Sequence, residues 1–262
     1  MTQPSFFAKI KDKFHRADIP VGFLILPAGV LIFLFGLQYA ICTQIIPIDV
    51  ATHYLFMNLS APSPSSFFLS HYVHDPSSPH HIIINALIFF FTVFCIFQFR
   101  YLILPALGWR SPPNLIKNTS LLVLFFLPFS LSGIAIIIGG QVGYRYGCGF
   151  SGIAAAFVGF LIFLIVTSFV EVGKYRRTQG KSWKVLFGIG AMSILLPVYF
   201  WISESGRGDT PLYVHVGGYI FGLIIPLILS LIGGQFGDRK KVILYALLGT
   251  LFLLPLLAGV IL

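Results

Sequence analysis

The residues best suited to chemistry are a serine, two histidines and an asparagine that stand inside otherwise apolar runs. Ser151 lies in Gly149-Phe150-Ser151-Gly152, at the start of an apolar run that continues to about residue 172. His81 and Asn85 begin an earlier apolar run, and His215 begins a later one. Polar side chains are costly inside a membrane span, so four of them in comparable positions indicate one shared functional site.

These residue types match acyl transfer by a serine nucleophile. A serine hydroxyl attacks a carbonyl only when a base takes its proton, and neutral imidazole is suited to that exchange, so we expect Ser151 as nucleophile and His215 as base. His81 and Asn85 are four residues apart and share a helix face, from which both could donate to an oxyanion together with the backbone N–H of Ser151. No Asp or Glu stands nearby in these runs, which favours a Ser-His dyad.

Small residues accompany both reactive side chains and predict close helix packing. They are Gly149, Gly152, Ala155 and Gly159 around and after Ser151, and Gly218 and Gly222 after His215. Small residues on one face let two helix backbones approach closely in lipid. Packing the face of Ser151, Ala155 and Gly159 on that of Gly218 and Gly222 is expected to bring Ser151 within hydrogen-bonding range of His215.

The elements that position these residues are expected to be membrane-spanning helices. The 262 residues are 57% hydrophobic and only 10% charged, and runs of about twenty apolar residues recur along the chain. The fold class is therefore an all-α polytopic membrane protein, without a cleavable signal peptide. Seven spans are expected, at about 21–44, 80–104, 119–139, 149–172, 184–203, 212–233 and 242–262.

We divide the chain into three parts. Residues 1–20 form a basic cytosolic segment, residues 21–233 a six-helix core, and residues 234–262 a basic loop with the seventh helix. Within the core, the loop at about 47–79 lacks Lys and Arg, and its aromatic residues indicate a segment that lies in the membrane interface.

The distribution of charge predicts the orientation. Fifteen of the seventeen Lys and Arg residues fall on the side of the N-terminus if seven spans are crossed. The positive-inside rule then predicts a cytosolic N-terminus and an outside C-terminus, with the four polar residues near the outer leaflet. Because the net charge of +9 is spread between spans and not gathered in one domain, we expect the lipid bilayer as a partner and no nucleic acid.

Together these patterns resemble the rhomboid family of intramembrane serine proteases. His81/Asn85 match its His-x-x-x-Asn in the second core helix, Gly149–Gly152 its Gly-x-Ser-Gly in the fourth, and His215–Gly222 its His-x-x-Gly-x-x-x-Gly in the sixth. With this chain's composition, all three arise together by chance in about one sequence in a thousand.

The resemblance implies a rhomboid-like six-helix core plus a C-terminal seventh helix, and an endopeptidase that needs no cofactor or metal. It implies Ser151 as nucleophile, His215 as base, and His81 and Asn85 as oxyanion donors. The substrates would be single-pass transmembrane proteins, cleaved near the outer leaflet, and the location would be the cell membrane if the source is prokaryotic. Lateral substrate access between the second and fifth helices would be lined by Phe89, Phe90, Phe94, Phe200 and Trp201.

Two positions depart from the family pattern. Ala155 stands four residues after the serine, where family members often carry an aromatic residue that stacks on the histidine. The first loop has no Trp-Arg pair, which many members carry there. We therefore expect a different support for the imidazole and a different anchor for the loop.

Two other functions are compatible with the sequence. The first is a catalytically inactive rhomboid-like protein that binds membrane helices. The second is a metal-binding transporter or sensor, because imidazole and carboxylate groups suit zinc and cluster before the second span. That cluster is His71, His74, Asp75, His80 and His81. By resemblance, either His71 or His74 could instead be a supporting histidine of the protease.

Overall fold

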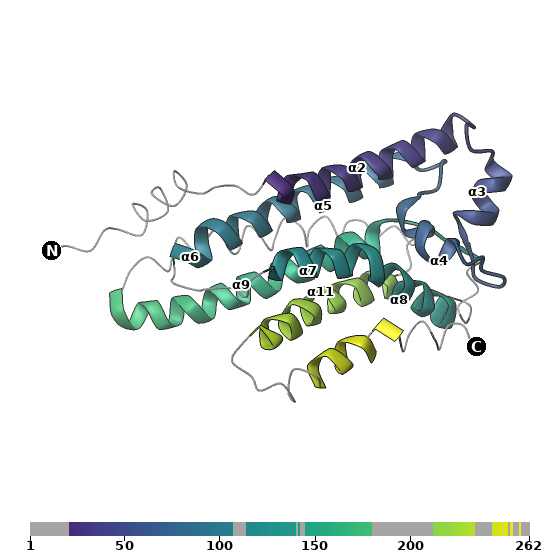
Figure 1. The fold of residues 1–262 in the computed structure, drawn as a ribbon. Coiled ribbons are helices and arrows are strands. Elements are labelled where there is room, and N and C mark those ends of the chain that lie inside the picture. Colours follow the sequence, from purple (N-terminus) through teal and green to yellow (C-terminus); the bar gives the residue numbers. More distant parts are fainter. Residues whose placement is uncertain are drawn as a thin grey trace.

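The described part of the chain is almost entirely helical (Figure 1), and its long apolar helices make it a multi-pass membrane protein. The computed structural model describes residues 21–106, 114–139, 141, 145–179, 212–233, 243–250, 252–253 and 257, with backbone only for 21–24 and 169–179. Five helices in this part are long and apolar enough to cross a membrane, at Ile25–Cys42, Pro79–Ile103, Leu115–Gly139, Ser151–Ser168 and Leu212–Ile232. In an apolar solvent, the helix satisfies every backbone polar group within its own segment, which is why these runs adopt it.

The spanning helices are built from several consecutive elements. They are α2 (Val21–Cys42), α5 (Pro79–Gln98), η2 (Phe99–Ile103), α6 (Leu104–Ala106), α7 (Leu115–Leu121), η3 (Leu122–Phe126), α8 (Leu127–Ile134), η4 (Ala135–Gly139), α9 (Ser151–Gln179) and α11 (Leu212–Ile232). Five of the seven expected spans correspond to these helices, with ends displaced by a few residues. The expected span at 184–203 lies outside the described residues.

The last expected span is described in part. Residues 243–250 are helical, and Phe252 lies against two core helices. The hydroxyl of Ser130 in α8 donates to the Phe252 carbonyl at 2.9 Å, and the ring of Phe221 in α11 lies 5.7 Å from that of Phe252. The described part of the C-terminal segment therefore packs beside the α8 and α11 face of the bundle.

The long loop after α2 is folded against the bundle. It contains α3 (Ile48–Tyr54), β1 (Met57–Asn58), α4 (Ser66–Leu69) and the 3₁₀ turn η1 (Ser70–Tyr72). Strand β1 pairs antiparallel with β2 (Tyr146–Gly147), directly before the serine motif. The Phe68 ring packs at 5.1 Å from that of Tyr72 and at 5.8 Å from that of Phe129 in α8. Strand pairing and aromatic packing thus anchor a loop that has no Trp-Arg pair.

A proline in the third spanning helix provides one further anchor. Pro128 has no N–H, so it cannot donate to the carbonyl of Leu124 four residues earlier, and the helix widens to a π-helical turn at η3. The Tyr72 hydroxyl donates to that carbonyl. A backbone acceptor released by proline therefore binds the loop directly before His74.

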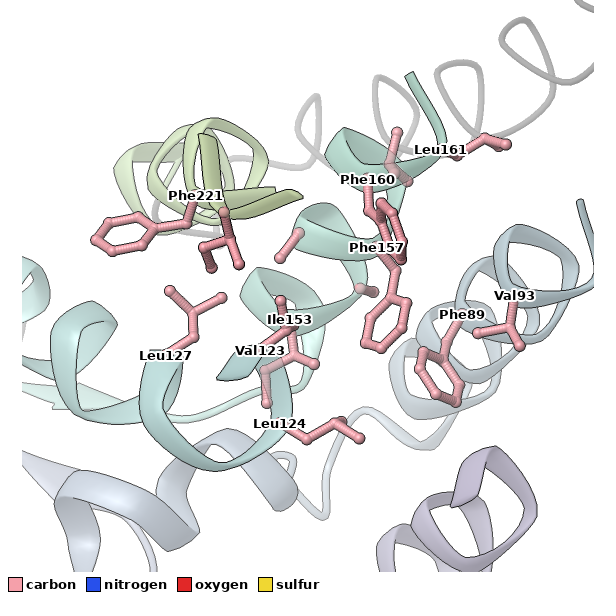
Figure 2. Packing of buried hydrophobic residues seen from close by; sticks show 14 of the residues in the cluster. Phe89, Val93, Val123, Leu124, Leu127, Ile153, Phe157, Phe160, Leu161 and Phe221 are labelled. Atoms are coloured by element: carbon pink, nitrogen blue, oxygen red, sulfur yellow. The ribbon is translucent and has the colours of Figure 1, made fainter. Parts of the chain in front are cut away.

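Helix α9 forms the centre of the bundle, between α5 and α11. Figure 2 shows Phe157 reaching from α9 toward Phe89 on α5, and their rings meet edge to face at 4.9 Å. The first half of α9, from Ile153 to Leu161, is buried almost without interruption. Ser151, at the start of this helix, is thus held by a rigid, close-packed element.

Candidate active site

Ser151 is the first residue of α9 and is partly buried. The turn before it requires glycine, because Gly149 has φ +137°, a conformation that residues with a Cβ rarely adopt. A Cβ at Gly149 would lie 3.7 Å from Ser151 Oγ and 3.9 Å from His74 Nε2. The serine hydroxyl and an imidazole ring therefore converge on this turn.

His74 lies at the centre of the polar contacts around Ser151. Its Nε2 accepts from Asn85 Nδ2 at 2.9 Å and from the backbone N–H of Phe150 at 3.3 Å. Both bonds require a lone pair on Nε2, so the ring is neutral and carries its proton on Nδ1. Burial, together with the nearby charge of His81, lowers the pKa of His74 to about 3. The ring thus fixes the oxyanion candidate Asn85 and the start of α9 in one arrangement.

The structure brings His81 and Asn85 to the same place as His74. They lie one turn apart on α5, and the His81 ring meets the His74 ring at 5.4 Å between centroids. Asn85 is buried, and one of its two amide hydrogens is used by His74. The second amide hydrogen remains to donate to another acceptor.

His215 lies on α11, only 1% exposed, three residues before Gly218. Neither of its ring nitrogens has a hydrogen-bond partner among the described residues, so the expected bond between Ser151 and His215 is not formed here. Catalytic hydrogen bonds are commonly long or misaligned in the absence of substrate. Since no described residue bonds to this imidazole, the lone pair of its unprotonated nitrogen remains available to accept a proton.

The contact between α9 and α11 is as close as two backbones allow. A Cβ on Gly218 would lie 2.0 Å from the Gly152 carbonyl oxygen, and one on Gly222 would lie 1.9 Å from that of Ala156. The contact therefore runs through Gly152, Ala156 and also Gly159, where a Cβ would lie 2.2 Å from the Tyr219 carbonyl oxygen. Gly159 belongs to the expected face, whereas Gly152 and Ala156 stand one position later than its other two members, Ser151 and Ala155. The cause is the rotation of α9 about its axis, which helical spacing alone does not define.

Gln38 is a supporting residue that the sequence interpretation missed. Its side-chain oxygen accepts from the backbone N–H of His74 at 3.0 Å, and the residue is buried within α2. The available signal was an amide side chain inside the first apolar run, where such a group needs a hydrogen-bonding partner. Helix α2 thereby fixes the position of His74.

His71 is separate from this cluster. Its Nε2 lies 3.0 Å from Ser132 Oγ, and that hydroxyl donates to the carbonyl of Phe67 at 2.8 Å. Burial lowers the pKa of His71 to about 4. Of the two histidines that the sequence left open, His74 contacts the candidate site, and His71 joins the loop to α8.

The expected lining of a lateral opening is wrong at one residue. Phe89 is fully buried, and its ring packs edge to face on that of Phe150 at 5.2 Å. Phe90 and Phe94 are about half exposed on the outer face of α5. The helical period turns Phe89 inward, on the same face as Asn85. Phe200 and Trp201 lie outside the described residues.

Within the described residues, no group of three or more His, Cys, Asp or Glu side chains converges to hold a metal ion. The residues of the histidine-rich segment are all described, and they separate into the His74/His81 pair, the His71 contact and exposed positions.

No protein-family model matches the chain, and no curated protein or solved structure matches it significantly.

Proposed function

We propose that this protein is a rhomboid-like intramembrane serine endopeptidase that cleaves single-pass transmembrane substrates. The observation that carries the proposal is the convergence of Ser151, His74 and Asn85 at one turn, where Gly149 has positive φ. The backbone contact between α9 and α11 supports it, because this contact sets the start of the serine helix against the helix of His215.

The proposed mechanism gives each group one role. The Ser151 hydroxyl attacks the scissile carbonyl, and His215 takes its proton and transfers it to the amine that leaves as the C–N bond breaks. Water, with His215 again as base, then hydrolyses the resulting ester and restores the serine hydroxyl. The second amide hydrogen of Asn85, His81 and the backbone N–H at the first turn of α9 donate to the oxyanion. His74 holds Asn85 without touching the substrate, so it is a positioning residue.

The placement of the chain in the membrane is part of the proposal. Seven crossings in a six-plus-one arrangement would leave the N-terminus in the cytosol and the C-terminus outside. The end of the bundle with α3, α4 and the starts of α5, α9 and α11 would then face the outer leaflet. In a prokaryote this membrane would be the cell membrane.

The test is cleavage of a single-pass substrate in proteoliposomes by the full chain and by Ser151→Ala and His215→Ala. Both variants should lose all measurable cleavage, and a fluorophosphonate probe should label the unmodified chain but not Ser151→Ala. Ser168→Ala is the matched serine control, because Ser168 is buried on the same helix and its hydroxyl donates to the Leu164 carbonyl of that helix. His53→Ala is the histidine control, because His53 is exposed on α3.

A catalytically inactive helix-binding protein is the second candidate, because no bond joins His215 to Ser151. Three results would support this second candidate. The unmodified chain would bind transmembrane peptides as tightly as Ser151→Ala does, it would not cleave them, and it would not react with the fluorophosphonate probe. Loss of cleavage in Ser168→Ala equal to that in Ser151→Ala would also contradict the dyad.

A further inference from the structure

A cavity of about 540 Å³ opens toward the end of the bundle away from Ser151 and extends inward to Phe89, whose ring packs on that of Phe150. It opens between the start of α2, the end of α5 with η2, and α7. Its inner wall is hydrocarbon and aromatic, formed by Phe89, Val93, Ile96, Leu124 and Phe157. A cavity of this size can hold a substantial part of an elongated apolar molecule.

Two cations stand at the cavity, and neither pairs with a carboxylate in the described part of the chain. Arg100 is partly buried in η2, with its guanidinium 5.3 Å from the centre of the Tyr101 ring. Lys117 is exposed on α7, and Asn114 adds an amide beside it. The aromatic face holds Arg100 in place without neutralising its charge. The lining thus combines an apolar interior with positive charge.

The bilayer supplies molecules with this combination of properties. Basic pockets between spanning helices bind anionic lipid headgroups, with about 1 kcal/mol from each Lys or Arg near the surface. The positive charge selects an anionic headgroup, and the apolar wall selects an acyl chain, so a free anion would use only half of the site.

We propose that this cavity is a binding site for an anionic phospholipid, with one acyl chain against Val93 and Phe157 and the phosphate between Arg100 and Lys117. The site lies outside the residues of the proposed protease and does not depend on them.

The experiment measures lipid retention by the purified full chain in a nonionic detergent, using native mass spectrometry and the shift of the thermal unfolding midpoint. The probes are dioleoyl phosphatidylglycerol, dioleoyl phosphatidylcholine and inorganic phosphate. The variants are Arg100→Gln, Lys117→Gln and Val93→Phe, which narrows the cavity without changing charge. Arg145→Gln is the matched control, because Arg145 is exposed at the other end of the bundle and its loss removes the same charge.

The unmodified chain should bind phosphatidylglycerol in preference to phosphatidylcholine. Arg100→Gln and Lys117→Gln should each weaken phosphatidylglycerol binding about fivefold, Val93→Phe should weaken it at unchanged charge, and Arg145→Gln should leave it unaltered. Three results would overturn the proposal. They are equal retention of the two lipids, a loss of phosphatidylglycerol binding in Arg145→Gln as large as in Arg100→Gln or Lys117→Gln, and a shift of the unfolding midpoint by inorganic phosphate alone as large as that by phosphatidylglycerol. If Arg100→Gln does not fold, Lys117→Gln decides the outcome, because Lys117 is exposed.

Discussion

His74 joins three segments of the chain through its ring and its backbone. Gln38 of α2 accepts from its N–H, Asn85 of α5 donates to its Nε2, and the N–H of Phe150 donates to the same nitrogen. A buried donor that loses its acceptor costs about 1–3 kcal/mol. The ring therefore matters both for stability and for the orientation of Asn85.

We expect His74→Ala to lower the free energy of unfolding by about 1–3 kcal/mol, because two buried N–H groups lose their acceptor. Under the proposed function, the main kinetic effect should be a lower kcat with a smaller change in KM, because Asn85 would no longer be oriented to donate to the oxyanion. Thermal unfolding in detergent and cleavage kinetics check both results. In an Asn85→Ala background, His74→Ala should lower the free energy of unfolding by less than it does in the unmodified chain. An equal decrease in both backgrounds would contradict the coupling between His74 and Asn85.

Two buried neutral histidines make the stability depend on pH. Burial lowers the pKa of His71 from 6.5 to about 4 and that of His74 to about 3. As the pH falls below 6.5, these histidines bind protons in the unfolded chain but not in the folded chain. Their contribution to the free energy of unfolding is therefore fully present above pH 6.5 and is progressively lost below it.

The free energy of unfolding should therefore be steady above pH 6.5 and fall between pH 6.5 and 4, by about 1.4 kcal/mol per pH unit for each histidine. Thermal midpoints measured across this range test it. His71→Gln should reduce the slope, because glutamine does not titrate. A slope unaffected by His71→Gln would show that other groups cause the acid sensitivity.

Tyr72 and Pro128 form a pair whose coupling can be measured. Tyr72→Phe should cost about 1 kcal/mol or more, because the carbonyl of Leu124 loses its donor. Pro128→Ala restores a backbone N–H that can bond to this carbonyl, so Tyr72→Phe should cost less in that background. A double-mutant cycle of thermal unfolding measures the difference. Additive costs would show that the tyrosine acts only through its packing.

At the scale of the elements, the α9–α11 contact is the most demanding in the bundle. Gly218→Ala should lower the free energy of unfolding by about 1–3 kcal/mol, because its Cβ would meet the Gly152 carbonyl oxygen and force the helices apart. Under the proposed function, cleavage should fall in parallel. Thermal unfolding and proteoliposome assays measure the two effects.

Gly36→Ala is the control for this prediction. Gly36 also lies inside a helix, α2, but a Cβ there meets nothing within 4 Å. Its replacement should be neutral, or stabilising by about 0.5–1 kcal/mol, because alanine favours the helix. If both substitutions had the same effect, helix propensity and not the interhelical contact would be the cause.

At the scale of the whole molecule, the charge distribution predicts opposite sides for the two termini. Reporter fusions should place the N-terminus in the cytosol and the C-terminus outside, because fifteen of the seventeen basic residues then lie inside. Both termini on one side would mean an even number of crossings and would contradict the seven-span arrangement.

Single cysteines can test which end of the bundle faces outward, in a chain from which Cys42, Cys95 and Cys148 have been removed. Ser60→Cys, exposed in the loop after α2, should react with an impermeant maleimide from outside. Lys117→Cys, exposed at the opposite end, should react only after the membrane is opened. The reverse pattern would invert the proposed topology.

The sequence by itself determined the membrane class and most of the spans. Transfer of a helix into lipid depends on the length and composition of its apolar run, which are local properties. The sequence also identified Ser151, His215, His81 and Asn85 as polar residues that need a partner or a function, because their cost in lipid is local as well.

Only the tertiary structure decided which groups meet. The choice of His74 over His71, the support from Gln38 and the inward position of Phe89 depend on the loop path and on the rotation of each helix. The same holds for the contact through Gly152 and Ala156. These quantities are set by packing between segments far apart in the chain, and no periodicity within a single segment contains them.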